Sequence, residues 1–365
     1  MPSILVAFFL AFHHCWISLP PLFLVDKFLQ PFLDGLQTDS PSFHLIALVV
    51  LVLLGFFLLT KGGDLLTDGA SDLARGLGIH PAVIGLTVVS ISTSAPELFT
   101  SMAAIVGDAK RLIIGNVVGS NLANVGLILG VAAFVRPIKM KGSLPNWQST
   151  LLLLITILFS VCCLWPGKAT FDRLNGITFV VILAIYLVFV TRHALKDRKA
   201  YKKKREAETQ ETEGNISIAR AILLVLGATV ALWFGSDVLV IGAKSLAESA
   251  SVPQELIGLT VLAIGTSLPE LAASWALAKR SESSMLVGNV VGSNLFNLTF
   301  VAGLAGTMSP IPVNSALGQI EFPAMLLVTV LLCWLVRREK IGLPHGIFLL
   351  VFYFSAIGIS WILHA

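Results

Sequence analysis

The chain contains two copies of one motif, which reads GLTVVSISTSAPELFTSMAAIVGDAKRLIIGNVVGSNL at residues 85–122 and GLTVLAIGTSLPELAASWALAKRSESSMLVGNVVGSNL at residues 258–295. Twenty of the 38 aligned positions are identical, at a constant offset of 173 residues and without a gap. The identities include Thr, Ser, Pro, Glu, Asn and Gly, which two apolar segments do not share by accident. The chain therefore contains an internal repeat.

The composition around the two copies is that of a membrane protein. Of the 365 residues, 56% are apolar and only 13% are charged, whereas soluble domains carry about 25% charged residues. These values exclude an ordinary cytoplasmic globule, a disordered tail and a disulfide-stapled secreted domain. The four cysteines lie in apolar runs without the spacing of metal ligands, so neither redox chemistry nor a zinc site is expected.

Ten apolar runs of roughly 20 residues predict ten transmembrane helices, because a lone strand cannot satisfy its backbone hydrogen bonds in lipid. The predicted fold is therefore an all-α membrane protein. The runs lie at about residues 43–60, 82–106, 112–135, 149–166, 174–192, 218–242, 254–278, 285–306, 320–337 and 343–363.

The repeat divides these ten spans into two sets of five, at residues 43–192 and 218–363. Because five is an odd number, the second set enters the membrane from the opposite face. The sequence thus predicts two inverted-topology repeats with a site near the midplane, an architecture of secondary transporters. Residues 1–42 form an N-terminal extension whose apolar run lacks the positive n-region of a signal peptide. An extra span, a poor signal sequence and a mis-assigned start codon are all open for it.

The positive charges predict the orientation of the chain. Counting Lys and Arg on alternate sides of the ten spans puts 19 of the 25 on one side, which is therefore expected to be cytoplasmic. That side includes the polar stretch 193–217, a basic block followed by an acidic one. We interpret this stretch as a solvated cytoplasmic linker loop, with binding of a partner or an anionic lipid surface as the alternative.

Two glutamates, Glu97 and Glu270, lie about midway along predicted spans and at equivalent positions of the repeat. A carboxylate at the centre of a membrane helix costs about 2.5–3.5 kcal/mol. A pair of protonated or mutually hydrogen-bonded structural acids is one interpretation. Intramembrane acids more often mark an ion or proton path, and the residues around them favour that second interpretation.

Hydroxyl groups and a proline precede each glutamate. Helical spacing puts Ser90, Thr93, Ser94 and Glu97 on one face in the first copy, and Ala263, Thr266, Ser267 and Glu270 on one face in the second. Pro96 and Pro269 each remove one backbone hydrogen bond and so free the carbonyl four residues earlier. Irregular backbone at this depth is tolerated only beside protein or a wet cavity. Each proline could simply kink its helix. The hydroxyls and the glutamate beside it instead favour an interpretation in which the freed carbonyl oxygens point at an ion.

The GNVVGSN blocks add amides to this set. Ser120 and Asn124 stand four residues apart on one face, as do Ser293 and Asn297. Helix packing alone explains the glycines of these blocks, and a lone membrane Asn often serves only as an interhelical hydrogen-bond partner. Three asparagines per copy, beside two glutamates, instead favour a polar site.

The donors of both motifs are carboxylate, hydroxyl, amide and peptide oxygens, which suit hard cations such as Ca²⁺, Na⁺ and Mg²⁺ rather than zinc or copper. Two ionised glutamates carry a charge of −2, which one Ca²⁺ or at least two monovalent ions neutralise. An unloaded site of that charge does not easily cross a low-dielectric barrier. This favours obligatory exchange over uniport, and protons are possible replacements for the metal ion on the glutamates.

These motifs resemble the α-repeats of the calcium/cation antiporter superfamily, in particular those of prokaryotic sodium/calcium exchangers. GTSLPE at 265–270, STSAPE at 92–97 and both GNVVGSN blocks carry the resemblance, which extends over residues 43–363. It implies alternating access in two inverted halves, with the helices at 43–76 and 218–250 as sliding gates. It also implies that Glu97 and Glu270 bind calcium, that the carbonyls of Thr93 and Thr266 contribute, and that other cation ligands are Ser94, Ser267, Asn124 and Asn297.

The sequence departs from that pattern at two places. The typical sodium/calcium pattern has an acid at one of the two positions held here by Asn124 and Asn297, which raises the chance of proton coupling or of another cation. Ser92 stands where the usual residue is Gly. The leading hypothesis is an antiporter that moves Ca²⁺ outward against Na⁺; the alternatives are a Ca²⁺/H⁺ antiporter of the same fold and a cation channel.

The remaining expectations concern location and partners. The sequence predicts a multi-pass protein of the bacterial inner membrane that is not an enzyme and needs no cofactor, since HExxH and P-loop patterns are absent. Its expected partners are the lipid bilayer and the transported ions, Ca²⁺ together with Na⁺ or H⁺. No nucleic-acid partner is expected, because the positive residues cluster in short loops, and the sequence predicts no particular oligomeric state.

Overall fold

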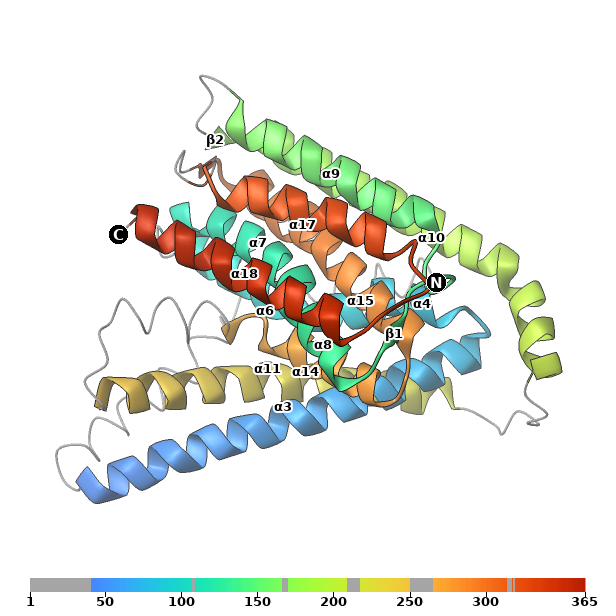
Figure 1. Cartoon of the computed structure of the whole chain (residues 1–365), viewed down its shortest axis with the longest axis horizontal. Coiled ribbons are helices and arrows are strands. Elements are labelled where there is room, and N and C mark those ends of the chain that lie inside the picture. The colour runs from blue at the N-terminus through green and yellow to red at the C-terminus, as the bar shows by residue number, and fades with distance from the viewer. Residues whose placement is uncertain are drawn as a thin grey trace.

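A computed structural model describes residues 41–106, 109–165, 170–208, 217–249, 265–313, 317 and 319–364, and within these residues it is a helical bundle (Figure 1). Seven of the described helices or helical runs are long and apolar enough to cross a membrane. They are α3 (Pro41–Leu77), α7–η2–α8 (Arg111–Val135), α9 (Asn146–Leu164), α10 (Arg173–Glu208), α11 (Ile218–Ser249), α15–η4–α16 (Ser283–Met308) and α18 (Leu343–His364).

Three further segments complete the bundle in the described part of the chain. One is a bent pair: α4 (Pro81–Ile84), η1 (Gly85–Val89) and α5 (Ser90–Thr93) lead into α6 (Ala95–Val106) at an angle of 40°. The others are shorter helices, α14 (Leu268–Lys279) and α17 (Glu321–Leu335). Nine of the ten predicted spans coincide with helices, and the seventh, at 254–278, is described only from Gly265 onward. The predicted N-terminal segment lies outside the described residues, apart from the first two residues of α3.

Three helices extend beyond the predicted apolar spans: α11 reaches Ser249 rather than residue 242, and α3 and α10 extend further. The bounds of α3 and α11 are close to the gate helices at 43–76 and 218–250 that the family resemblance implies. Helix α3 continues to Leu77 rather than ending near residue 60, and α10 continues to Glu208 rather than ending at residue 192. Much of the predicted linker loop at 193–217 is therefore helical. Residues 193–208 are rich in the strong helix formers Ala, Leu, Lys, Arg and Glu. The helix therefore continues beyond the end of its apolar stretch.

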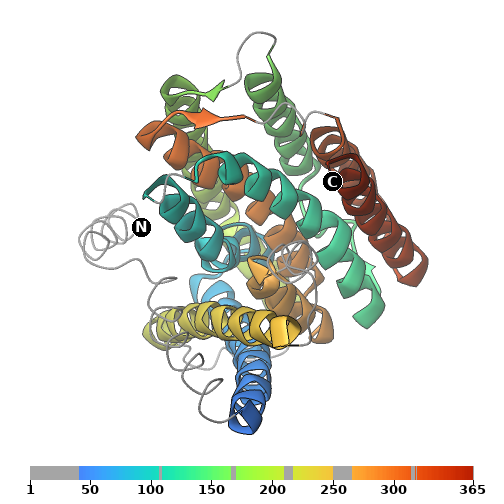
Figure 2. The ribbon, with the colours of Figure 1, turned by 90° about the vertical axis from the view of Figure 1, so that its left-hand side faces the viewer.

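Helices α3 and α11 pack side by side along one side of the bundle (Figures 1 and 2). Glycines let the two backbones approach closely, as small residues do in membrane helix pairs. A Cβ atom added at Gly55 would lie 2.6 Å from the amide nitrogen of Leu239, and one added at Gly235 would lie 2.8 Å from the Cβ of Leu58. The two gates implied by the family resemblance thus form one helix pair.

Two short antiparallel ribbons join the halves of the chain. β1 (Ile138–Lys139) pairs with β4 (Lys340–Ile341), and β2 (Thr170–Phe171) pairs with β3 (Ile311–Pro312). Each ribbon takes one strand from each half. Because α9 runs from the β1 end of the bundle to the β2 end (Figure 1), the ribbons lie at opposite ends of that helix.

The second GNVVGSN block, on α15, packs against α4 and η1 of the bent pair in the first half. A Cβ atom added at Gly288 would lie 2.5 Å from the carbonyl oxygen of Ala82, and one added at Gly292 would lie 2.6 Å from that of Leu86. These contacts press α15 against α4 and η1, directly before the first glutamate. The two halves are therefore packed backbone to backbone beside the polar motifs.

We predict that Gly288→Ala lowers the melting temperature of the detergent-purified protein by several degrees. The added methyl group meets a backbone carbonyl oxygen, which cannot move aside as a flexible side chain can. Overpacking of this kind costs about 1–3 kcal/mol. The control is Gly227→Ala on α11, where an added Cβ atom meets nothing within 4 Å. A melting temperature of Gly288→Ala equal to that of the control would contradict the close packing.

Candidate cation-binding site

Each glutamate follows a break in its helix. At Ser94 the backbone leaves helical geometry, with φ −83° and ψ 6°, and at Ser267 it does the same, with φ −91° and ψ 5°. Pro96 and Pro269 come two residues later and lack the N–H that would continue the helix. Glu97 and Glu270 consequently lie in the first turns of α6 and α14, where the helix dipole favours negative charge.

The two carboxylates are buried and poorly satisfied. Glu97 and Glu270 are each 1% exposed. One hydrogen bond reaches them across the repeat, from Ser94 Oγ to Glu270 Oε1 at 3.2 Å. Both carboxylate oxygens of Glu97, and Oε2 of Glu270, have no hydrogen-bond partner among the described residues. Because buried polar atoms are nearly always paired, these oxygens are suited to a cation or a proton.

Both predicted amides begin a π-helical turn. The N–H of Leu129 donates to the carbonyl of Asn124, five residues earlier, and that of Ala302 donates to the carbonyl of Asn297. Single π turns inside α-helices occur often at functional sites. Both asparagines are buried, and the Nδ2 and Oδ1 atoms of Asn297 have no partner among the described residues.

The hydroxyl groups fall into two sets. Thr93 is fully buried, and its Oγ1 lies 3.5 Å from Ser293 Oγ in the other half. Ser267 Oγ is buried without a partner among the described residues. By contrast, the described side-chain hydrogen bonds do not connect Ser120, which is buried, or Thr266, which is half-buried, with the other predicted residues.

One carbonyl that the sequence leaves free for an ion is bound by a side chain instead. The hydroxyl of Ser236, on α11, donates to the carbonyl oxygen of Gly265 at 2.7 Å. Pro269 does free this carbonyl, but at least one of its lone pairs is taken. The sequence did not single out Ser236, although Gly235 and Asp237 on either side of it repeat Gly62 and Asp64 of the first half at the same offset of 173 residues.

A second residue missed by the sequence analysis is Asn289 of the second GNVVGSN block. Its backbone carbonyl accepts a hydrogen bond from Ser90 Oγ at 3.1 Å, and its Nδ2 donates to Ser274 Oγ at 3.2 Å. It thereby connects α15 to both glutamate-bearing segments. The signal that could have found it is the repetition of Asn at three positions per copy.

The arrangement suits a hard cation held by few charges. The described residues contain no group of three or more His, Cys, Asp or Glu side chains placed to hold a metal ion. The acids of the candidate site are therefore Glu97 and Glu270, and the described hydrogen bond to their carboxylates comes from the hydroxyl of Ser94. Oxygen-only donor sets are those that Ca²⁺ and other hard cations prefer.

Comparisons with known proteins find similar membrane proteins over most of the chain. A family model described as "Sodium/calcium exchanger protein" matches residues 47–192 and 220–362. The inner membrane protein YrbG of Escherichia coli is 34% identical over 316 residues, which cover 82% of this chain and 92% of that protein. The sodium/calcium exchanger MaX1 of Methanosarcina acetivorans is 31% identical over 341 residues, covering 83% and 95%.

A solved structure of the sodium–calcium exchanger NCX_Mj is also similar to this chain. The two superimpose with a TM-score of 0.73 and share 30% sequence identity. The match covers 86% of this chain and 99% of the other. The chain is therefore similar to sodium/calcium exchangers both in sequence and in fold.

We predict that Ca²⁺ raises the melting temperature of the native protein in detergent but not that of Glu97→Gln. A ligand at about 100 times its dissociation constant stabilises a folded protein by about 2.7 kcal/mol, and the amide removes half of the site's charge. The control is Glu339→Gln, which changes an exposed carboxylate paired with Lys141. An equal Ca²⁺-induced rise in Glu97→Gln would contradict the site.

Proposed function

This chain belongs to the sodium/calcium exchanger protein family, and on the strength of that membership we propose that it exchanges Ca²⁺ for Na⁺ by alternating access. It is a multi-pass integral membrane protein, as relatives named for membranes and its own apolar helices indicate. In this proposal Ca²⁺ moves outward, and the counter-ion binds in the same oxygen-lined site.

One observation carries the proposal: two buried glutamates from different halves lie in one hydrogen-bonded neighbourhood. Ser94 of the first half donates to Glu270 of the second, while three of the four carboxylate oxygens have no partner among the described residues. A buried, uncompensated charge is costly. A bound cation removes that cost, so we assign ion binding to Glu97 and Glu270, with oxygens from Ser94, Ser267, Asn124, Asn297, Ser120, Ser293, Thr93 and Thr266.

We further propose the architecture of ten transmembrane helices in two inverted repeats. The strand pairing supports it, because β1 and β3 are separated by the repeat offset of 173 residues and each pairs with a strand of the other half. The ribbons lie at opposite ends of α9. An inverted repeat requires equivalent ribbons at opposite faces of the membrane.

A second candidate keeps the fold and uses H⁺ as the counter-ion. It is favoured by the amides at Asn124 and Asn297, which leave the described site with two acids. Two protons or two Na⁺ ions balance two carboxylates equally well, so the charge of the site does not distinguish these ions.

The test is calcium uptake into proteoliposomes, first under an imposed Na⁺ gradient and then under a pH gradient. We expect the Na⁺ gradient to drive uptake and both Glu97→Gln and Glu270→Gln to abolish it, because each removes one of two charges that hold Ca²⁺. Both variants should still reach the membrane folded. Size-exclusion profiles and melting curves of the purified variants check this.

The other outcomes each reject a part of the proposal. Uptake driven only by the pH gradient would replace Na⁺ by H⁺. Current without any counter-ion would indicate a channel. Normal uptake by either glutamine variant would reject the site.

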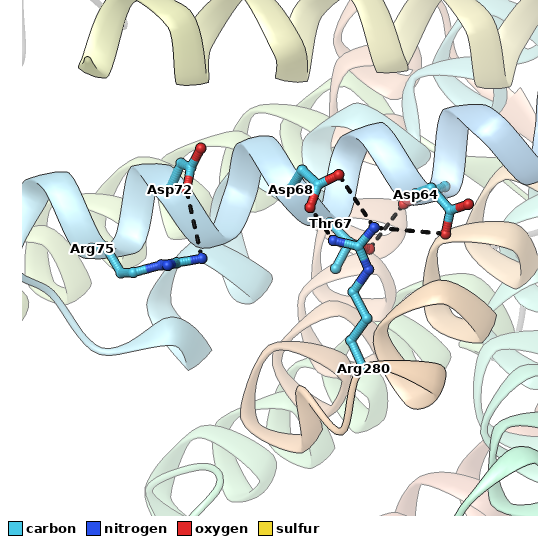
Figure 3. A network of polar contacts seen from close by, with 7 residues as sticks. Asp64, Thr67, Asp68, Asp72, Arg75 and Arg280 are labelled. Atoms are coloured by element: carbon cyan, nitrogen blue, oxygen red, sulfur yellow. Dashed lines mark hydrogen bonds and ion pairs between the residues drawn. The ribbon is translucent and has the colours of Figure 1, made fainter. Parts of the chain in front are cut away.

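We also propose that α3 and α11 slide during exchange, and one ion pair bears on that movement. Arg280, at the end of α14, pairs with Asp68 of α3 through both of its terminal nitrogens and lies 3.9 Å from Asp64 (Figure 3). The hydrogen bonds that Arg280 donates to the carboxylate of Asp68 raise the pKa of Arg280, so this side chain stays charged. Since α14 begins with the Glu270 turn, the pair connects the gate helix to an ion-binding element.

We predict that Arg280→Gln speeds exchange by up to about fivefold. Sliding of α3 past α14 breaks the pair, and a half-exposed pair contributes no more than about 1 kcal/mol. The control is Lys141→Gln, which removes the same charge from a pair with Glu339 that does not involve α3. The measurement is the initial rate of Na⁺-driven calcium uptake, and slower exchange in Arg280→Gln, or an equal effect in the control, would contradict the prediction.

A further inference from the structure

The GNVVGSN blocks contain a pair of equivalent asparagines, Asn121 and Asn294, to which neither the proposed function nor the family comparison assigns a role. Asn294 is fully buried on α15. Its Oδ1 accepts a hydrogen bond from Asn124 Nδ2 at 2.9 Å, and its Nδ2 donates to the backbone carbonyl of Asn121 at 3.3 Å. The three residues therefore form one chain of hydrogen bonds across the two halves.

The donors and acceptors of these three residues permit only one orientation of each side-chain amide. A backbone carbonyl can only accept, so Asn294 has to turn its NH₂ group toward Asn121 and its oxygen toward Asn124. Asn124 then has to present its own NH₂ group to that oxygen. The Oδ1 of Asn124 is left at the other end of the planar amide, and no hydrogen bond from a described residue occupies it.

The orientation of the Asn124 amide determines whether it can bind a cation. An amide binds a cation only through its oxygen, and its NH₂ group repels positive charge. An Asn side chain that turned freely would present the wrong group part of the time. A fixed hydrogen-bond partner for the NH₂ group keeps the oxygen facing the cation.

We propose that Asn294 is a positioning residue that holds the carboxamide of Asn124 with its oxygen available to the transported cation. The inference rests on the proposed function, because it assumes that Asn124 contributes to the cation site. It assigns to the second half of the chain the control of a ligand on the first half.

The equivalent residue of the first copy does not do the same in this structure. Asn121 donates its Nδ2 to Val117 of its own helix at 2.7 Å, and both amide atoms of Asn297 have no partner among the described residues. The two site amides are therefore held differently. Asn124 is oriented by Asn294, whereas Asn297 is not oriented by its counterpart Asn121.

The experiment measures Ca²⁺ affinity of the full-length protein by calorimetry for a double-mutant cycle between positions 294 and 124. Asn294→Leu removes the acceptor at similar volume and should weaken Ca²⁺ binding about fivefold, the usual effect of losing one hydrogen bond. Asn294→Ala serves the same purpose if the Leu variant does not fold. In an Asn124→Asp background the loss should fall below about twofold, because a carboxylate presents an oxygen whichever way it turns.

The matched control is Thr299→Val, an isosteric change of a fully buried residue whose hydroxyl, among the described residues, bonds only the carbonyl of Leu295 on its own helix. It should leave Ca²⁺ affinity unchanged. An equal loss from Asn294→Leu in both backgrounds would mean a merely structural role and would overturn the inference. So would an unchanged affinity of Asn294→Leu alone. If the native protein itself binds no Ca²⁺, the proposed function falls, and this inference falls with it.

Discussion

The burial of two carboxylates between the halves of one membrane chain is the constraint on which the rest of the structure depends. Neither glutamate can stay charged in a low-dielectric interior unless something balances it. The helix breaks at Ser94 and Ser267 give each acid a place in the first turn of a helix, where the dipole opposes part of its charge. Balancing the remainder is the task of an ion or a proton.

The halves meet through polar contacts as well as through packing. Ser94 reaches Glu270, Thr93 lies against Ser293, and Asn124 donates to Asn294. Ser236 on α11 and Arg280 beside α3 extend these contacts to the helix pair at the side of the bundle. A displacement of that pair has to break or remake the Ser236 hydrogen bond to Gly265, two residues before the helix break at Ser267, and the ion pair of Arg280 at the far end of the same helix. These contacts are a physical route for coupling ion binding to movement.

Much of this could be predicted from the sequence because it depends on local pattern. Hydropathy located nine of the helices, and the repeat brought both glutamates and their serines to equivalent positions. Hydropathy ended the first span near residue 60, since it reports lipid contact rather than helix length, whereas the family resemblance implied a helix at 43–76, close to the observed end of α3 at Leu77. The hydroxyl bound to the Gly265 carbonyl and the direction of the Asn124 amide escaped as well, because each depends on a partner on another helix, in one case 170 residues away.

The amides at Asn124 and Asn297 limit what the site can carry. With two carboxylates as its acids, the site has a charge of at most −2, which one divalent ion or two monovalent ions cancel. Each such loaded form is neutral and crosses the low-dielectric part of the membrane at little electrostatic cost. The unloaded form keeps its full charge and is held back. In the proposed exchange, the same charge that attracts a cation therefore also keeps the unloaded protein from changing sides, which gives the proposal its physical basis.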